Sequence, residues 1–373
     1  MKKILFLNNE YELKAGGEIF LLDLLHELKN KYEIFCVCKK EGELSVALAN
    51  DGVNVVFADV SYSTKIKNLL INYRNFHNLV SKTKNIKNIS AIYANSGTVN
   101  RVAGRVAKFF DAKLVTHLHD FFDAPKNDKY SLRYSDVILT CSKKISEIAK
   151  KYNSNVKVIY NGISKERFSP ALKTSEKNLK KKFNIENNFL IGIAGTIGHK
   201  KGFFDFVDIA KEISDKIKDV KFIVIGGIKP NENYLIKDLK EKIEKFNLKD
   251  KFIFTGFLND IENALSALDV FIFPAHYEAF GRVLIEAFAC KIPVISTYCG
   301  GPEEIIDNGE NGFLFKVGDV KGMAGKAIEL YDDENLRKTI AENAYSKFLD
   351  KFTTDKMVAS IEGEIEKLIG SED

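Results

Sequence analysis

Two glutamates of this chain, Glu278 and Glu286, are candidates for ligand binding or catalysis because of their residue type and their spacing. Glu286 lies within the apolar run Val283–Ala289, and Gly281 stands at the expected start of the helix that carries it. A carboxylate among apolar side chains costs several kcal/mol unless a partner neutralises it. A helix start attracts anions through its free N–H groups and its dipole. The segment therefore predicts a phosphate at the helix start and a sugar diol on Glu286. A place on a solvent-facing stripe is the alternative, but the apolar neighbours leave little such stripe.

Apolar strands are expected to position these glutamates. The pattern predicts a buried strand over 269–274, a loop with Glu278, a helix, and a second strand over 292–296. A Gly-Gly turn and another helix follow at 300–306. This order is typical of parallel α/β sheets, in which ligands bind at the carboxyl ends of the strands.

Together these residues resemble the retaining glycosyltransferases of family 4. That family has two glutamates separated by seven residues, then an apolar strand and a Gly-Gly-x-x-Glu stretch. Glu278 and Glu286 match the pair, and Gly300, Gly301 and Glu304 match the stretch. The resemblance implies the GT-B architecture, an α/β fold with two facing Rossmann-like, doubly wound domains and an interdomain cleft. It also implies that Glu278 contacts the donor sugar and that Glu286 binds the ribose hydroxyls.

Strand and helix patterns alternate along the chain in two series. The first series predicts a helix over Gly17–Leu28 and strands over 4–7, 34–37, 53–57, 91–93, 114–117, 137–140 and 156–160. The second predicts a helix over 203–218 and strands over 189–194, 222–225, 252–255, 270–273, 294–296 and 313–315. We expect an acceptor-side domain over 1–165, a linker over 166–188 and a nucleotide-sugar domain over 189–350. The resemblance suggests that a C-terminal helix, 353–369, packs back on the first domain.

Two turns are candidates for binding the donor diphosphate. Gly16 and Gly17 follow the first strand, and paired glycines let a backbone approach a diphosphate closely, although an ordinary loop has the same composition. The family usually has Gly-Arg followed five residues later by Lys-Gly, two cations that grip the leaving diphosphate. Lys201 matches the lysine, whereas Thr196 stands at the arginine position. The alternatives for the missing cation are Lys200, His199 and Arg282.

Polar groups end two predicted strands of the first domain. The resemblance places His119, which Asp120 follows, near the transferred sugar. A structural role is the commoner one for a histidine at a strand end. We expect His117 to point to the other face of its strand. Asn95 and Ser96 are acceptor-side candidates, and capping of the next helix is an equal interpretation.

The turn after residue 255 completes the set, because in the family its backbone holds the nucleotide base. Backbone contacts do not depend on the identity of the side chain, so the sequence does not indicate which base is bound. We assign catalysis to His119, Lys201 and Glu278, and the acceptor side to Asn95 and Asp120. Donor binding is assigned to Gly16, Gly17, Thr196, Phe257, Leu258, Phe280, Gly281, Arg282, Val283 and Glu286.

Composition limits the class and the location of the protein. The 373 residues are 45% hydrophobic and 29% charged, with a net charge of +5. The five cysteines form no CxxC pair, which favours reduced thiols in the cytoplasm. No Cys/His cluster has metal-ligand spacing. A membrane-spanning helix needs about 20 apolar residues, and no stretch approaches that length. We expect a cytoplasmic protein without cofactor or metal.

The segment 61–88 is basic and contains no acidic residue. Its cations are Lys65, Lys67, Arg74, Lys82, Lys84 and Lys87, beside an apolar face at helical spacing. A crossover helix with a solvated basic face is one interpretation. Contact with anionic lipid, peripheral at the inner face of the plasma membrane, or with a lipid-diphosphate acceptor is the other. The short run Lys180–Lys182 is typical of solvated surface, so we expect no nucleic-acid partner.

The favoured function is transfer of a sugar from a UDP- or GDP-sugar to a glycan or lipid-linked acceptor, with retention at the anomeric carbon. The setting would be the synthesis of cell-surface polysaccharide or glycoconjugate. No D-x-D sequence occurs, so we expect metal independence. A nucleotide-sugar 2-epimerase and a non-catalytic nucleotide-sugar-binding subunit, raised by Thr196, are the alternatives with this architecture. Dehydrogenases and P-loop nucleotidases are disfavoured, because neither G-x-G-x-x-G after a strand nor G-x-x-x-x-G-K-[ST] occurs.

Overall fold

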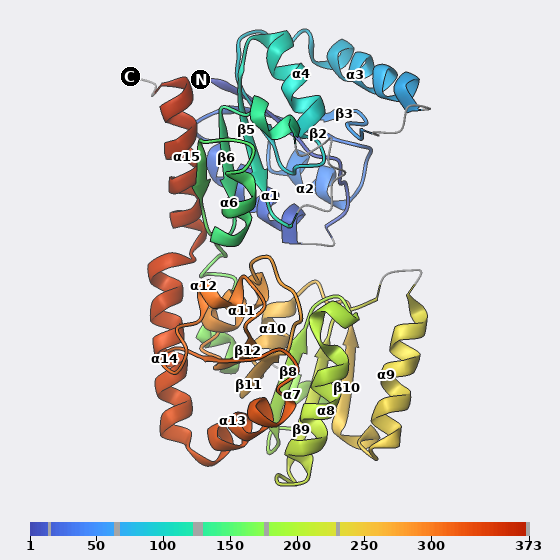
Figure 1. Ribbon diagram of the computed structural model, residues 1–373, viewed down its shortest axis with the longest axis vertical. Coiled ribbons are helices and arrows are strands. Elements are labelled where there is room, and N and C mark those ends of the chain that lie inside the picture. The colour runs from blue at the N-terminus through green and yellow to red at the C-terminus, as the bar shows by residue number, and fades with distance from the viewer. Residues whose placement is uncertain (14–15, 63–67, 122–129, 175–178, 229–231, 371–373) are drawn as a thin grey trace. The chain divides into compact units, whose positions relative to one another are not determined.

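The protein divides into two compact units, Met1–Gly162 with Thr354–Asp373, and Ile163–Thr353. The structure, a computed structural model, describes residues 1–13, 16–62, 68–121, 130–174, 179–228 and 232–370. Each unit has its own parallel sheet and its own core, and is described by itself (Figure 1).

The first unit is built on a seven-stranded parallel sheet with the order β3-β2-β1-β4-β5-β6-β7. The chain runs outward from β1 to β3 and then returns to β4 beside β1, which is the doubly wound topology. Sheets of this kind are covered on both faces, so their strands are nearly continuous apolar runs. The strands are β1 (Lys3–Leu7), β2 (Glu33–Cys38), β3 (Asn54–Phe57), β4 (Ile89–Ala94), β5 (Lys113–Leu118), β6 (Val137–Thr140) and β7 (Val156–Val158).

Helices cover both faces of this sheet. One core joins the sheet to α1, α2 and α15, and a second core joins the opposite face to α3 and α4 (Figure 1). The helices are α1 (Gly16–Leu28), α2 (Glu43–Asn50), α3 (Leu69–Thr83), α4 (Asn100–Phe110), α6 (Lys143–Ala149), α15 (Thr354–Ile369) and the 3-10 turn η2 (Tyr130–Tyr134). The C-terminal helix α15 thus belongs to the first unit, with Met357, Ile361 and Ile365 in its core.

The second unit is built on a six-stranded parallel sheet with the order β10-β9-β8-β11-β12-β13. Here β8 and β11 are the central neighbours, so the loops that follow them lie at the switch point of the topology, where ligands bind in such sheets. The strands are β8 (Phe189–Ala194), β9 (Val220–Ile225), β10 (Phe252–Gly256), β11 (Val270–Phe273), β12 (Val294–Thr297) and β13 (Phe313–Phe315).

The main core of the second unit lies between one face of the sheet and the helices α8, α9 and α13 (Figure 1). The helix α11 contacts α10, α12 and α14. The helices are α7 (Leu179–Phe183), α8 (Phe203–Ser214), α9 (Asn233–Lys245), α10 (Ile261–Leu265), α11 (Arg282–Ala289), α12 (Pro302–Ile305), α13 (Val320–Asp332) and α14 (Glu334–Lys351). Three 3-10 turns are η3 (Pro170–Thr174), η4 (His199–Lys201) and η5 (Lys249–Lys251).

The predicted fold class is confirmed, since both sheets are parallel and doubly wound. Strand boundaries move by a few residues; the strand expected over 91–93 runs over Ile89–Ala94. The helix expected over 203–218 ends at Ser214, and α14 is longer. Residues 163–188, most of which were expected as a linker, fall in the second unit. Within the described part of the chain, no helix is both long and apolar enough to span a membrane.

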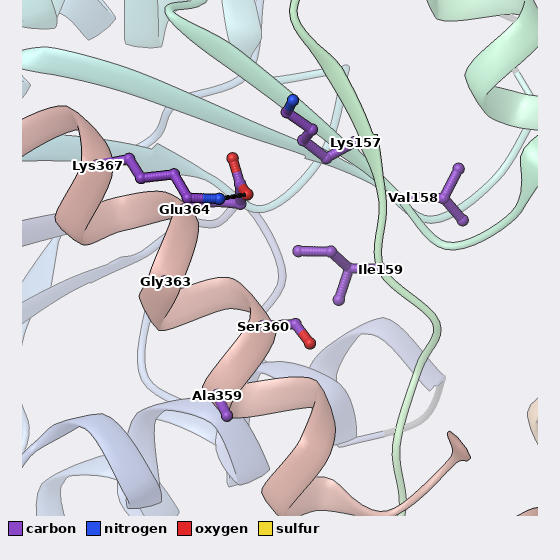
Figure 2. Close-up of a pocket in the computed structure, with 8 residues that line it drawn as sticks. All are labelled: Lys157, Val158, Ile159, Ala359, Ser360, Gly363, Glu364 and Lys367. Atoms are coloured by element: carbon purple, nitrogen blue, oxygen red, sulfur yellow. Dashed lines mark hydrogen bonds and ion pairs between the residues drawn. The ribbon is translucent and has the colours of Figure 1, made fainter. Parts of the chain in front are cut away.

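A hollow of about 400 Å³ lies in the first unit between the edge strand β7 and α15 (Figure 2). The helix presents small residues toward it, Ala359, Ser360 and Gly363, and an ion pair between Lys367 and Glu364 closes one end. None of the residues assigned to catalysis or to donor binding lines this hollow.

Candidate active site

Lys201 ends the turn η4, which follows the central strand β8. The next residue, Gly202, has φ +71°, and a Cβ there would lie 1.9 Å from the carbonyl oxygen of Pro274. Only glycine lets the loop after β11 approach so closely. That loop is also tied to η4 by the His276 N–H, which donates to the Lys200 carbonyl at 2.9 Å. These contacts fix the position of Lys201.

The Lys201 ammonium donates to the Glu278 carboxylate in a charge-assisted hydrogen bond. Nζ of Lys201 also lies 5.6 Å from the centre of the Phe273 ring, at the end of β11. Glu278 is largely shielded, with 13% of its side chain exposed. Ion pairs shielded from water are screened less than surface pairs. Two residues that the sequence assigned to catalysis are therefore in direct contact.

The Gly-Gly turn holds Glu278 in place through its backbone. The Glu278 N–H donates to the Cys299 carbonyl at 3.2 Å, and the Gly301 N–H donates to the Glu278 carbonyl at 2.8 Å. A Cβ on Gly301 would lie 2.2 Å from the backbone of Phe280, so this position needs glycine for close approach. Burial raises the pKa of the Cys299 thiol to about 11, so this thiol stays protonated beside the charged pair.

Glu286 lies on α11, which begins after Gly281 in the left-handed region with φ +103°. Its side chain is buried, and Nε of Arg282 lies 3.6 Å from its Oε1, one turn earlier on the same helix. Burial raises the pKa of the Glu286 carboxyl, and the charges of Arg282 and Arg167 oppose that rise. A buried carboxylate with a cationic neighbour is suited to accept hydrogen bonds from a pair of hydroxyls.

Sequence reasoning missed a further charged residue, Arg167. Its Nε donates to Glu262 Oε2 at 3.1 Å, and its Nη2 lies 3.0 Å from the same oxygen. The same Nη2 donates to the carbonyl of Asn259 at 2.9 Å. In the sequence, Arg167 lies within a polar stretch, and its partners Asn259 and Glu262 are 92 and 95 positions away. No local pattern could have pointed to it.

The other donor-side residues differ in exposure. Thr196 is exposed after β8, Phe257 is 57% exposed and Leu258 is half-buried in the turn after β10. Phe280 is buried, and Val283 is half-buried in the first turn of α11. Of the alternatives for the missing arginine, His199 stacks on Phe204 with ring centres 4.8 Å apart, Arg282 faces Glu286, and Lys200 is exposed.

In the first unit, His119 follows directly after β5 and is joined to two other candidates. Its Nε2 lies 3.1 Å from Oδ1 of the buried Asn95, and Nδ2 of Asn95 donates to the Gly17 carbonyl at 3.5 Å. Phe20, on the first turns of α1, lies 4.5 Å from the His119 ring, centre to centre. The fold therefore brings together Gly17, in the first turn of α1, with Asn95 and His119, which directly follow β4 and β5.

The expectation for His117 is wrong. Its ring stacks on that of His119 with centres 4.2 Å apart, because residues two apart on a strand share a face. His117 is fully buried, and Nδ1 lies 2.6 Å from the Tyr93 hydroxyl. Burial, and to a lesser extent the charge of His119, holds the pKa of His117 well below its usual range. The inner ring of this stack is therefore neutral.

The remaining candidates of the first unit are near the surface. Gly16 is the exposed first residue of α1, and its neighbour Ala15 lies outside the described residues. Asp120 is exposed, and its Oδ1 accepts a hydrogen bond from the Phe121 N–H at 2.7 Å. Among the described residues, His, Cys, Asp and Glu side chains form no group suited to a metal ion.

Comparison with known proteins shows the class to which this protein belongs. The chain matches the crystal structure of Anabaena Alr3699/HepE in complex with UDP and glucose, with a TM-score of 0.84 at 23% identity, over 98% of this chain and 100% of that one. The fold of this protein is thus GT-B. The model described as Glycosyltransferase Family 4 matches residues 15–167, and the one described as Glycosyl transferases group 1 matches 175–347. The chain belongs to the group 1, family 4 glycosyltransferases.

Curated relatives match in part or over nearly the full length. The chain is 36% identical over 160 residues to the 2-deoxystreptamine N-acetyl-D-glucosaminyltransferase of Niallia circulans, covering 42% of this chain and 40% of that protein. It is 25% identical over 374 residues to the UDP-Gal:alpha-D-GlcNAc-diphosphoundecaprenol alpha-1,3-galactosyltransferase of Escherichia coli, covering 94% of this chain and 93% of that protein. The chain spans between 40% and 60% of the length of the first three curated relatives it matches.

Proposed function

We propose that this protein transfers a hexose from a UDP- or GDP-sugar to a glycan or lipid-linked acceptor, with retention at the anomeric carbon. The observation that carries the proposal is the charged set at the switch point of the second unit: Lys201 paired with Glu278, and the buried Glu286 on the helix that begins at Gly281. A cation, a carboxylate and a helix start at one sheet edge suit a diphosphate, a sugar and a ribose.

Each residue has a separate part in this reaction. The bond between the anomeric carbon and the β-phosphate oxygen breaks, a bond from the acceptor oxygen to that carbon forms on the same face, and the acceptor proton passes to the departing phosphate. Lys201 stabilises the negative charge that grows on that phosphate. Glu278 faces the carbon that becomes positive, and Glu286 holds the ribose in ground and transition states alike. Lys201 supplies the charge that a metal would otherwise supply, which supports a metal-independent reaction.

His119 is assigned to the transferred sugar, with Asn95 and Asp120 toward the acceptor. The contact between His119 and Asn95 directs the imidazole, and the Gly17 carbonyl accepts from the same amide. Imidazole and amide groups donate and accept hydrogen bonds without net charge, which suits sugar hydroxyls. Gly16, Gly17 and Thr196 are assigned to the donor diphosphate, and the turn at Phe257 and Leu258 to the base.

The relatives support the setting of the proposal. The name of the Escherichia coli relative includes a UDP-sugar donor and a lipid-diphosphate acceptor, and another relative is the capsular polysaccharide biosynthesis glycosyltransferase CapM of Staphylococcus aureus. We therefore place the protein in cell-surface polysaccharide or glycoconjugate synthesis, on the cytoplasmic side of the membrane.

A surface of the first unit supports membrane contact. On α3, Leu70, Ile71 and Tyr73 are 77%, 54% and 62% exposed, beside the exposed Arg74. The stretch without acidic residues extends from 60 to 110 and thus includes the α4 cations as well. Lys65 and Lys67 lie outside the described residues. Exposed apolar side chains among cations are the composition that anionic lipid surfaces bind.

Incubation with UDP- and GDP-sugars, with and without a lipid-diphosphate sugar acceptor, tests the function. Release of nucleoside diphosphate that requires the acceptor, with an α-anomer product from an α-linked donor, is the expected result. An epimerised sugar with free nucleotide would identify a 2-epimerase instead. Binding of the donor without any product, across a panel of acceptors, would identify a non-catalytic subunit.

A further inference from the structure

Arg167 connects the first residues of the second unit to the turn after β10. Its guanidinium reaches both the Glu262 carboxylate on α10 and the Asn259 carbonyl, with distances of 2.9 to 3.1 Å. Asn259 directly follows Phe257 and Leu258, the residues assigned to the nucleotide base. A guanidinium is planar and presents its donors in a fixed fork, so two partners held at once define an orientation.

The segment that carries Arg167 is itself fixed by local hydrogen bonds. The Arg167 N–H donates to Oγ of Ser164 at 3.0 Å, and the Phe168 N–H donates to the Ser164 carbonyl at 3.0 Å. Phe168 is buried. The base turn, in contrast, is open: Gly256 has φ +68° and Phe257 is more than half exposed. A well-anchored arginine therefore holds a turn that has little packing of its own.

We propose that Arg167 is a positioning residue for the nucleoside end of the donor, which orients the base turn through Asn259 and α10 through Glu262. The proposal rests on the proposed function, in which this turn and Glu286 bind the nucleoside. Arg167 has a second effect, because its charge favours the ionised form of Glu286, as does that of Arg282 on the same helix, while Glu262 on α10 opposes both. Ionised Glu286 accepts from both ribose hydroxyls through two charged oxygens, and such charge-assisted hydrogen bonds are stronger than those of the protonated carboxyl.

Titration calorimetry with UDP and with GDP, between about pH 5 and about pH 8, tests the proposal. Arg167→Gln is expected to weaken binding about tenfold at neutral pH, since a charge-assisted hydrogen bond that orders the site is lost. The loss should grow as the pH falls, because without this cation a larger fraction of Glu286 is protonated. Arg167→Lys keeps the charge but loses the fork, so its affinity should be reduced by a similar factor at every pH.

Arg337→Gln is the matched control. Arg337 also donates to backbone carbonyls, those of Leu330 and Tyr331, and it connects α13 with α14. Its substitution is expected to lower Tm without a change in UDP or GDP affinity. The proposal is overturned if Arg167→Gln and Arg167→Lys bind as the parent does while Glu286→Gln loses binding. It is also overturned if the Arg167→Gln deficit is the same at every pH and Arg167→Lys restores full affinity. A parent that binds neither nucleotide would instead overturn the proposed function.

Discussion

The candidate residues of the two units use different chemistry, although both units are built on sheets of the same topology. In the second unit the candidate residues are charged and paired: Lys201 with Glu278, Arg282 with Glu286, Arg167 with Glu262. In the first unit, apart from the exposed Asp120, they are imidazole rings, an amide and a carbonyl, joined around His119. Charge of both signs suits a diphosphate and an electron-poor carbon, whereas neutral donors and acceptors suit sugar hydroxyls. The difference predicts that substitutions at the charged residues of the second unit affect rate and nucleotide affinity, and that substitutions at His119 and Asn95 affect the selection of the sugar and the acceptor.

Loss of the Lys201 charge should have the largest effect. Lys201→Ala is expected to lower turnover by about 10²- to 10³-fold, as removal of one transition-state donor does in other enzymes. The measurement is nucleotide release under donor saturation. Lys211→Ala, which removes a partly exposed lysine of α8 that pairs with Asp215, is the control and should leave turnover unchanged. A Lys201→Ala enzyme as fast as the parent would show that the leaving phosphate is stabilised elsewhere.

The two glutamates should separate chemistry from binding. Glu278→Gln is expected to bind UDP or GDP nearly as the parent does while turnover collapses, since its contact strengthens only as the carbon becomes positive. Glu286→Gln is expected to weaken nucleoside diphosphate binding by about 1.5 to 3 kcal/mol, the range for hydrogen bonds to charged groups. Calorimetric titration beside transfer rates decides between them. The opposite pattern would reverse the two assignments.

The buried imidazole of His117 should make the first unit sensitive to acid. Its folded pKa lies well below the unfolded value of about 6.5, so the unfolded chain binds more protons as the pH falls. The free energy of unfolding should therefore decrease as the pH drops below about 6.5. The double variant His117→Phe with Tyr93→Phe, which removes both polar groups, should show a shallower decrease.

Urea unfolding at several pH values measures this slope. His77→Gln, at an exposed histidine of α3, is the control and should keep the slope of the parent. An unchanged slope in the double variant would mean that His117 is protonated, or is no longer buried, under native conditions.

Membrane contact should give the smallest effect per residue. Arg74→Gln is expected to reduce binding to phosphatidylglycerol vesicles about fivefold, since a basic residue near an anionic surface contributes about 1 kcal/mol. Sedimentation at two salt concentrations measures it, with Lys237→Gln on α9 of the second unit as the control. Equal pelleting with anionic and neutral vesicles would favour the interpretation of α3 as a crossover helix with a solvated basic face. The cations of the first unit would then have no function in membrane binding.

Much of the fold could be predicted from the sequence, because buried parallel strands are short apolar runs with a recognisable length. The strand over 189–194 was predicted with the bounds it has. Helix ends were less predictable: the apolar pattern continues to Ile217, but α8 ends at Ser214. The burial of Glu286 could be predicted because its apolar neighbours are adjacent to it in the sequence. The Arg167 contacts join residues 92 and 95 positions apart and could not be predicted from a local pattern. The stacking of His117 on His119 follows from strand alternation, which places residues two apart on the same face, so the expectation for His117 applied that rule wrongly.

The core of the first unit is discontinuous in sequence. Its sheet is built from residues 3–158, yet Met357, Val358, Ile361 and Ile365 of α15 fill the same core as Ile4 and Phe6. The ribosome makes the chain from the N-terminus, so the second unit can be completed while the first still exposes apolar surface on α1. Order of synthesis and order of completion are thereby reversed. A nascent chain stopped at Thr353 should carry a finished second unit and an aggregation-prone first one, until synthesis of α15 completes the core of the first unit.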